Sequence, residues 1–294
     1  MKLFLALLFF SFTLFASQGF ISVSELQQKI NDSNLVLLDV TDYKTYKKGH
    51  INNALQVDIA KFRNKVGSYQ IMKSSNEIEK LAQSLGINND SEIVIYGHGN
   101  EKELLQESYV ALALIVNGAK NISILDGGYL AWTFQSNLLS STDTVSARKG
   151  NFTAEYNPNI LVDIDYVKNS IGKVAMLDAR PTGLYYGTAL SKGVKRAGHI
   201  KGAMSSFWGD KFLKDETLRS DDELKEIFLT GYGLNSDDEV ILYCTGGLQA
   251  SMNWYILYSH LGFKNAKLYD ASLREWGNSD DTPMERFKWE LFKK

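Results

Sequence analysis

Short apolar runs separated by polar, helix-like stretches recur along this chain. Four of the runs are Val36–Asp39, Ile93–Tyr96, Val174–Asp178 and Val240–Tyr243. Continuous runs of β-branched residues and leucine are typical of strands that are buried on both faces. Their alternation with amphipathic segments predicts an α/β fold, in which a mostly parallel sheet is covered by helices on both faces.

The stretch after the fourth run has the spacing of a helix. Trp254, Leu257, Tyr258 and Leu261 recur at intervals of three and four residues, so they should form one buried face. Gly262 follows this face and is the predicted C-cap.

The two halves of the chain repeat one pattern. "GINNDSEIVIYG" (86–97) aligns with "GLNSDDEVILYC" (233–244), and "GAKNISILDGGYLAW" (118–132) aligns with "GFKNAKLYDASLREW" (262–276). Upstream, "LLDV" followed by "KGHINNA" is matched by "MLDA" followed by "AGHIKGA". Because the matched pieces keep their order, we infer a duplicated domain rather than a short solenoid repeat.

The N-terminus differs from the rest of the chain. Lys2 precedes an apolar run, Leu3–Phe15, that is too short to span a bilayer comfortably, and small residues follow it. The pattern predicts a secretory signal peptide and an exported, periplasmic protein with no membrane contact after cleavage; an uncleaved anchor is the alternative. The expected division of the chain is a signal peptide at 1–19, an N-terminal domain at 20–136, a Ser/Thr/Asn-rich linker at 137–159 and a C-terminal domain at 160–294.

Composition and residue spacing argue against nucleic-acid binding, an internal disulfide and a metal site. The 294 residues carry a net charge of −2 without a cluster of basic residues, which argues against an electrostatic nucleic-acid binder. The single cysteine, Cys244, cannot form an internal disulfide and would face an oxidising compartment as a free thiol. No two histidines stand with Cys, Asp or Glu at metal-site spacing, so neither a metal nor a cofactor is expected.

Cys244 follows a predicted buried strand and precedes a predicted helix. This is the carboxyl edge of a parallel sheet, where open α/β folds bind ligands. The residues expected to aim backbone N–H groups into one concavity are Thr245, Gly246, Gly247, Leu248 and Gln249. With the positive end of the following helix, such a cradle would favour the reactive thiolate. The alternative is that Cys244 is a small buried hydrophobe.

Taken in order, "LDAR", "AGHIKGA", "VILYCTGGLQAS" and "LYDASLREW" resemble the rhodanese sulfurtransferases, and the first half resembles a second, degenerate rhodanese domain. The resemblance covers nearly the whole chain after the signal peptide. It implies that Cys244 becomes a persulfide by taking sulfur from a donor such as thiosulfate or 3-mercaptopyruvate. A thiol or cyanide-type acceptor, or a redox protein, would then remove that sulfur.

The N-terminal copy lacks the nucleophile, because Gly97 stands where Cys244 stands in the C-terminal copy. We therefore expect an inactive N-terminal domain, in which the neighbouring His98 is a loop residue. His50 and His199 occupy matching Gly-His-Ile turns, which favours a shared structural role over catalysis. His260, near a helix end, is expected to be a capping or surface residue.

Arg180 and Arg196 are the predicted donor-binding cations, and Lys192 and Lys195 lie close to Arg196 in the sequence. Arg180 could instead pair with a neighbouring acid. The loop after Cys244 carries no charge, and Leu184 stands where the family has a substrate arginine. The sequence therefore does not identify the sulfur donor.

Two other functions remain to be considered. A Cys-dependent phosphatase needs an Arg six residues after its Cys, where this chain has Ala250. A sulfur carrier or partner-binding module without turnover is the remaining alternative to an enzyme.

Overall fold

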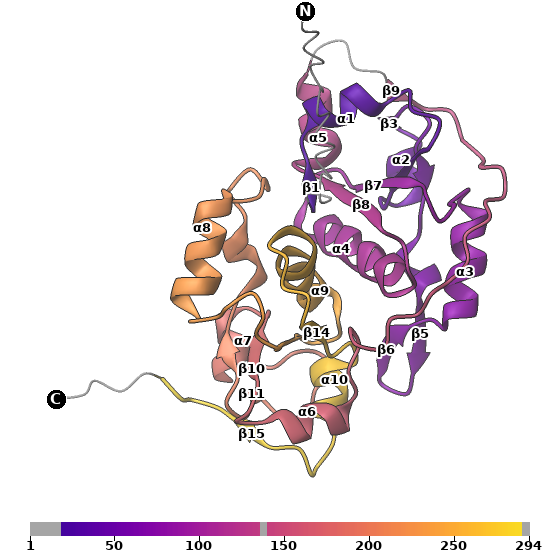
Figure 1. Ribbon diagram of the computed structural model, residues 1–294. Helices are drawn as coiled ribbons and strands as arrows, with labels where there is room; N and C mark the ends of the chain where they lie inside the picture. Colours follow the sequence, from indigo (N-terminus) through magenta and orange to yellow (C-terminus); the bar gives the residue numbers. More distant parts are fainter. Residues whose placement is uncertain (1–18, 136–139, 290–294) are drawn as a thin grey trace, which may run out of the picture.

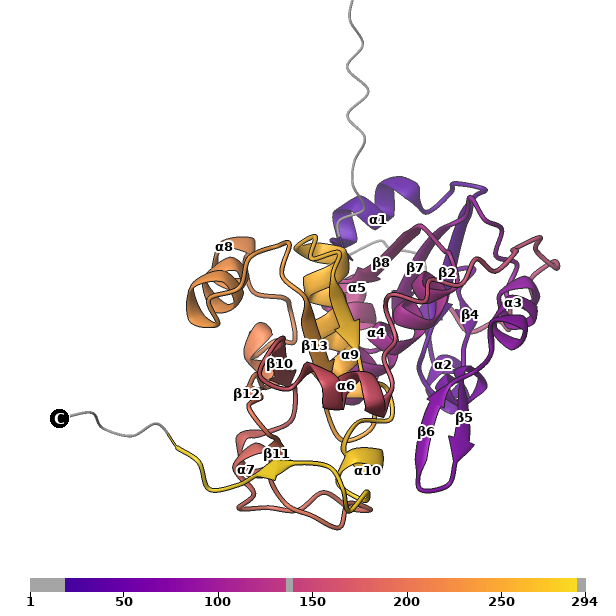
Figure 2. The same ribbon diagram turned by 60° about the horizontal axis from the view of Figure 1, so that its bottom comes forward.

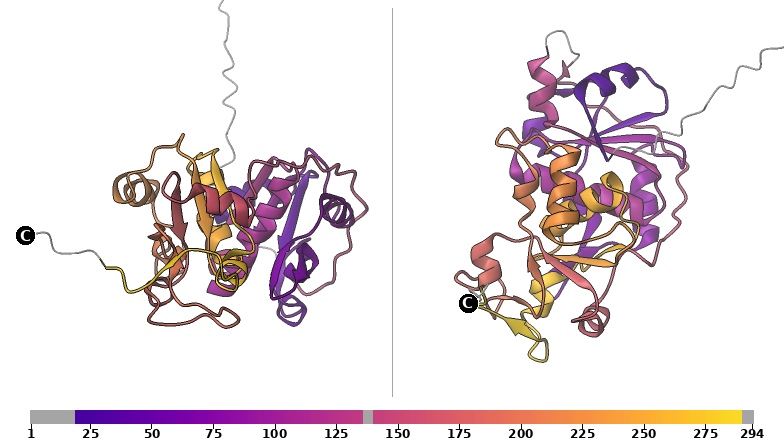
Figure 3. Two further views of the ribbon diagram at one scale, coloured as in Figure 1. Left: turned by 90° about the horizontal axis from the view of Figure 1, so that it is seen from below. Right: turned by 60° about the vertical axis from the view of Figure 1, so that its left-hand side comes forward.

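Two parallel sheets, one from each half of the chain, form two lobes that lie side by side (Figures 1 and 3). The structure, a computed structural model, describes residues 19–135 and 140–289. The signal-peptide prediction falls on residues that lie, apart from Gly19, outside these ranges. Within the described residues, no helix is both long enough and apolar enough to cross a membrane.

The N-terminal sheet has the strand order β1-β8-β7-β2-β4, and its neighbouring strands are all parallel. The strands are β1 (Phe20–Ile21), β2 (Leu35–Asp39), β4 (Leu55–Gln56), β7 (Glu92–Tyr96) and β8 (Asn121–Leu125). The helices of this half are α1 (Val23–Lys29), α2 (Tyr43–Tyr46), η1 (Ile59–Phe62), α3 (Ser75–Ser84), α4 (Glu101–Val116) and α5 (Gly128–Phe134).

The C-terminal sheet has the order β12-β10-β13-β14, again with parallel neighbours. Its strands are β10 (Ala175–Asp178), β12 (Met204–Ser205), β13 (Val240–Tyr243) and β14 (Ala266–Leu268). The helices are α6 (Ile164–Ser170), α7 (Thr182–Tyr186), η2 (Trp208–Lys211), α8 (Asp221–Lys225), η3 (Glu226–Gly231), α9 (Leu248–Tyr255), η4 (Ile256–His260) and α10 (Ser272–Trp276). The four predicted apolar runs form strands in both sheets, so the predicted α/β architecture is confirmed.

Among the residues that the structure describes, three antiparallel strand pairs lie outside the two sheets. They are β3 (His50–Ile51) with β9 (Ser140–Ser141), β11 (His199–Ile200) with β15 (Met284–Glu285), and β5 (Arg63–Val66) with β6 (Tyr69–Met72). The β5–β6 hairpin belongs to the N-terminal lobe and extends beside the C-terminal lobe (Figure 2).

The lobes meet along helices α4 and α9, which pack against each other between the sheets (Figure 1). Ser108 of α4 and Ser251 of α9 share a buried hydrogen bond of 2.9 Å between their hydroxyl groups. Trp254 and Leu257 are fully buried, as the helical spacing predicted, whereas Tyr258 and Leu261 of the same face are half-buried against the core. Gly262, with a φ of +82°, follows the end of this helical segment. One hydrophobic core therefore spans both lobes.

The described part of the predicted linker, residues 140–159, runs along the N-terminal lobe. After β9 it contains no helix or strand. Phe152 is fully buried, its amide donates to the carbonyl of Ile87 at 3.1 Å, and its own carbonyl accepts from Gln83. The segment is thus packed as part of the lobe surface.

Candidate active site

Cys244 follows β13 directly and is only 2% exposed. Its backbone is held by the first residues of α10, the helix that follows β14, the next strand in the sheet. The hydroxyl of Ser272 accepts from the Cys244 amide at 3.1 Å, and the Cys244 carbonyl accepts from the Leu273 amide at 3.1 Å. The carbonyl of Thr245 accepts from the Arg274 amide at 2.9 Å. The segments that follow two adjacent strands therefore bind each other and fix the backbone that carries the sulfur.

Two backbone amides point at the Cys244 sulfur. The amide nitrogen of Gly247 lies 3.1 Å from Sγ, and that of Gly246 lies 3.4 Å away. Fixed N–H groups of this kind stabilise an anion, and a thiolate is the nucleophilic form of cysteine. Helix α9 begins at Leu248, directly after these glycines, and adds the positive end of its dipole.

Gly247 cannot be another residue without a rearrangement of the loop. Its φ is +90°, and a Cβ built there would lie 2.1 Å from Oδ1 of the buried Asp270. Gly246 is different, because a Cβ there would meet Arg274 Cδ at an ordinary 3.5 Å. The cradle therefore depends on one obligatory glycine and one replaceable glycine.

The other predicted loop residues have separate contacts. Thr245 shares a 3.0 Å hydrogen bond with the hydroxyl of Ser191, which brings the segment before Lys192 to the site. Leu248 packs against the core shared by the lobes, and Gln249 is half-buried on α9. Of the five predicted loop residues, Gly246 and Gly247 are the two whose amides bind Sγ.

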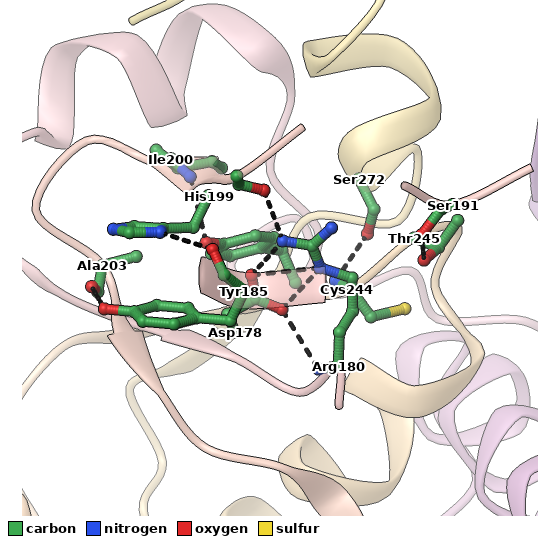
Figure 4. Close-up of polar contacts among 12 residues, drawn as sticks. Asp178, Arg180, Tyr185, Ser191, His199, Ile200, Ala203, Cys244, Thr245 and Ser272 are labelled. Atoms are coloured by element: carbon green, nitrogen blue, oxygen red, sulfur yellow. Dashed lines mark hydrogen bonds and ion pairs between the residues drawn. The ribbon is translucent and has the colours of Figure 1, made fainter. Parts of the chain in front are cut away.

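Arg180 lies beside Cys244 but is bound to the protein. It is 2% exposed, its Nε and Nη2 bond both carboxylate oxygens of Asp178, and Nη2 also donates to the carbonyl of Gly198 at 2.7 Å. Burial opposes its charge, but the attraction of Asp178 outweighs burial and raises the pKa of Arg180. In Figure 4 the Cys244 sulfur lies on the side of Thr245, and the guanidinium lies on the side of Asp178. Arg180 thus contributes a fixed charge near the thiol.

Arg196 is engaged through all three guanidinium nitrogens. They donate to the carbonyls of Gly277, Trp276, Ser279 and Thr282 and to the Thr282 hydroxyl. These bonds hold the segment after α10, so Arg196 must leave them before it could bind a donor. Lys192 and Lys195 are exposed nearby.

Arg274 is a residue that the sequence pattern does not single out. It belongs to α10, it is half-buried, and its side chain lies alongside Gly246. Its buried Nε has no hydrogen-bond partner among the described residues. The signal was present in the sequence, because α10 follows β14 at the same sheet edge as Cys244.

The corresponding site in the N-terminal lobe is filled by carboxylates. A Cβ built on Gly97 would lie 2.5 Å from Glu103 Cβ and 2.9 Å from Glu107 Oε1. The amide of His98 donates to Glu103 at 2.6 Å. Glu107 is fully buried, and its burial, together with the charge of Glu103 and other acids, raises its pKa well above the usual range. The space that a thiol would need is occupied in this half.

His50 and His199 have equivalent structural roles in the two lobes, as the sequence predicted. Their rings stack on Tyr46 and Tyr185 with centroids 3.7 and 3.9 Å apart, and each Nδ1 lies within hydrogen-bond distance of that tyrosine's carbonyl. Burial lowers the pKa of His199.

The two remaining histidines also have identified contacts. His98 stacks on Tyr129 with centroids 4.7 Å apart. His260, expected to be a capping or surface residue, has a side chain only 10% exposed, lies 2.8 Å from Asp221 and packs against Phe20. Over residues 19–135 and 140–289, no group of three His, Cys, Asp or Glu side chains could hold a metal.

Comparisons with known proteins give a consistent result. The model of the Rhodanese-like domain matches residues 22–135 and again 163–279. A "Putative thiosulfate sulfurtransferase" of Saccharopolyspora erythraea is 29% identical over 274 residues, covering 90% of this chain and 95% of that protein. The sulfur carrier protein TtuD of Thermus thermophilus is 29% identical over 282 residues, covering 90% and 96% of the two chains. Among solved structures, SseA of Escherichia coli, described as a 3-mercaptopyruvate sulfotransferase, has a TM-score of 0.75 and 25% identity, covering 87% and 98%.

Proposed function

Because this chain belongs to the rhodanese family, with two matched domains, we propose that it is a sulfurtransferase that carries sulfur on Cys244. The Cys244 thiolate attacks the outer sulfur of thiosulfate or the thiol sulfur of 3-mercaptopyruvate. A sulfur–sulfur bond to Cys244 forms as the S–S bond of thiosulfate or the C–S bond of 3-mercaptopyruvate breaks. Sulfite, or the enolate of pyruvate that then takes a proton, leaves with the bonding electrons. An acceptor thiolate or cyanide then attacks the outer sulfur of the persulfide. That step restores the Cys244 thiolate.

The single observation that carries this proposal is the pair of amides on the sulfur. The hydrogen bonds from Gly246 and Gly247 support the thiolate before transfer. The same thiolate is the leaving group when the acceptor takes the sulfur, so the amides favour both half-reactions. The contacts of Ser272 and Leu273 fix the Cys244 backbone, so the sulfur is already positioned against these amides before the reaction.

The choice of donor rests on the charge of the donor and the cations that lie near the loop. Thiosulfate is a dianion, and the loop side chains are uncharged. The guanidinium groups of Arg180 and Arg196 are held by the protein, whereas Arg274 is a half-buried cation directly beside the loop. 3-Mercaptopyruvate is a monoanion at neutral pH, so its binding requires less positive charge from this site. We therefore favour 3-mercaptopyruvate over thiosulfate.

A sulfur carrier that loads once without turnover is the second candidate. It is supported by the 29% identity to a protein named as a sulfur carrier. The deep burial of Cys244 also fits a persulfide that is transferred to a docked partner.

The N-terminal sequence further supports export to the periplasm, where a redox protein could act as the acceptor.

Steady-state turnover tests the proposal. The protein is incubated with 3-mercaptopyruvate or thiosulfate and an excess of cyanide or a dithiol, and product is followed beyond one equivalent. Continuous product formation that is absent in Cys244→Ser supports an enzyme. A single equivalent followed by a stop supports a carrier, and turnover in Cys244→Ser would overturn the proposal.

A further inference from the structure

The β5–β6 hairpin of the N-terminal lobe binds the loop that follows Cys244. Nη2 of Arg63, at the start of the hairpin, donates to the carbonyl of Gly246 at 2.7 Å. At the hairpin tip Ser68 donates to the carbonyl of Arg274, and Tyr69 donates to Glu275 at 2.8 Å. Three contacts therefore tie the lobe without a thiol to the active-site edge of the other lobe.

Arg63 is held rigidly by groups from both lobes. It is 8% exposed, and its guanidinium carbon lies 4.6 Å from the ring centroid of Tyr109. Nη2 lies 3.7 Å from Asp270, a carboxylate that accepts from the Tyr109 hydroxyl and the Met72 amide, each at 2.7 Å. Burial raises the pKa of Asp270, and the Arg63 charge opposes that rise. The cation is thus positioned before any substrate binds.

The carbonyl that Arg63 binds belongs to the same planar peptide unit as the N–H that binds the sulfur. The Gly246 carbonyl oxygen and the Gly247 amide lie on opposite sides of one peptide unit. A cation on the oxygen withdraws electron density from the amide and strengthens the N–H donor toward Sγ, 3.1 Å away. It also fixes the orientation of a peptide that is flanked by glycines on both sides, which resist rotation least.

We infer that Arg63 is a positioning residue for Cys244, because it orients and polarises the Gly246–Gly247 peptide whose N–H binds the sulfur. The N-terminal lobe, which cannot form a persulfide, thereby becomes part of the active site. This inference rests on the proposed function of Cys244 as the sulfur-carrying nucleophile.

Other charged and titratable groups lie close to Cys244 or to the loop that follows it. Arg180 and Asp178 lie at the end of β10, Arg274 lies on α10, Asp270 follows β14, and Tyr243 precedes Cys244. Of these groups, Asp270 contacts Arg63 directly. A variant that also replaces Asp270 is therefore needed to separate the effect of its charge from that of the peptide that Arg63 holds.

The test measures the pH dependence of Cys244 alkylation by iodoacetamide in the full-length protein, and this reaction needs no sulfur donor. Arg63→Met keeps much of the length of the side chain but removes its charge and its donors. We expect its alkylation rate at pH 7 to fall about tenfold, because a shift of roughly one pH unit in the profile corresponds to that factor. Arg63→Lys, which keeps the charge, should lie between wild type and Arg63→Met. Arg219→Met, at an exposed ion pair with Glu223, is the matched control.

Arg63→Met leaves Asp270 buried without its cation and could unfold the loop. The double variant Arg63→Met/Asp270→Asn removes that unpaired charge and should show the same shifted profile. Profiles of Arg63→Met and the double variant that superimpose on wild type would overturn the inference, even if wild type forms a persulfide. Failure of wild type to form a persulfide with either donor would overturn the proposed function instead.

Discussion

The carboxylate of Glu103 accepts a hydrogen bond from the backbone amide of His98 at 2.6 Å, in the N-terminal loop that corresponds to the loop after Cys244. In the C-terminal lobe, amides of the corresponding loop donate to a sulfur. The repeated fold thus presents an anion-binding loop twice. One copy is filled by a nucleophile and the other by a carboxylate of its own helix α4.

Gly97→Cys is expected not to create a second persulfide site. A side chain at this position would overlap Glu103 and Glu107, so the variant should lose roughly 1–3 kcal/mol of stability from overpacking. Sulfur loading is counted by intact mass after donor treatment of Gly97→Cys and of Gly97→Cys/Cys244→Ser. Loading of the double variant would show that the carboxylates do not close this site.

Glu107→Gln should stabilise the protein at neutral pH. The folded state raises the pKa of this carboxyl group, so the unfolded state loses its proton first as the pH rises. Its contribution to stability is therefore full below about pH 4.5 and declines above it, by roughly 1.4 kcal/mol per pH unit until the folded group ionises.

Urea unfolding at pH 5 and pH 8 measures the difference between Glu107→Gln and wild type. The gain from Glu107→Gln should be larger at pH 8. Glu101→Gln, at an exposed position of the same helix, is the control and should show no such trend. An equal gain at both pH values would contradict a protonated Glu107.

Gly247→Ala should lose sulfur transfer, whereas Gly246→Ala should keep most of it. The methyl group introduced by Gly247→Ala would stand where Asp270 Oδ1 lies and would require a positive φ, so the amide at 3.1 Å from Sγ must move. We expect about a tenfold or greater loss of kcat/KM, since an anion-stabilising donor is worth roughly 10²–10³ in other enzymes. Equal activities of the two variants would argue against the amide cradle.

Thiosulfate use should weaken with added salt and improve in Gly246→Lys. The half-buried Arg274 is a cation beside the loop, and salt screens its attraction for a dianion. A lysine at position 246 adds a charge, and its Cβ would meet Arg274 Cδ at an ordinary 3.5 Å. It should contribute about 1 kcal/mol or more if it bonds the donor. The KM for thiosulfate is measured over a salt series, with Arg274→Gln as the converse variant. If wild type binds thiosulfate tightly at every salt concentration and Gly246→Lys brings no gain, the backbone amides alone suffice to bind this donor.

The sequence predicted what local patterns encode. Apolar runs identified the strands, the repeat identified two lobes, and strand-end position together with two glycines placed Cys244 in an amide cradle. The contact between Arg63 and Gly246 was not predictable, because it joins residues 183 apart through the packing of one lobe on the other. Periodicity reports which face is buried, but it does not report which surface covers that face.

The contacts of the arginines near the site were likewise not predictable from local patterns. Charge and sequence position predict that Arg180 and Arg196 bind the donor, yet their hydrogen bonds depend on where Asp178 and the carbonyls at and after the end of α10 lie in space. Arg274 is distant from Cys244 in sequence, so no local pattern links the two residues. Adjacency of β13 and β14 brings it to Gly246.

The most direct test of sulfur transfer through Cys244 is the intact mass of the protein after brief incubation with 3-mercaptopyruvate and removal of the donor. Wild type should gain one sulfur atom per chain, which cyanide then removes. Cys244→Ser should fold normally and gain none, because its hydroxyl stays protonated near pH 7 and the chain has no other thiol. A sulfur adduct on Cys244→Ser, or none on wild type with either donor, would contradict the account.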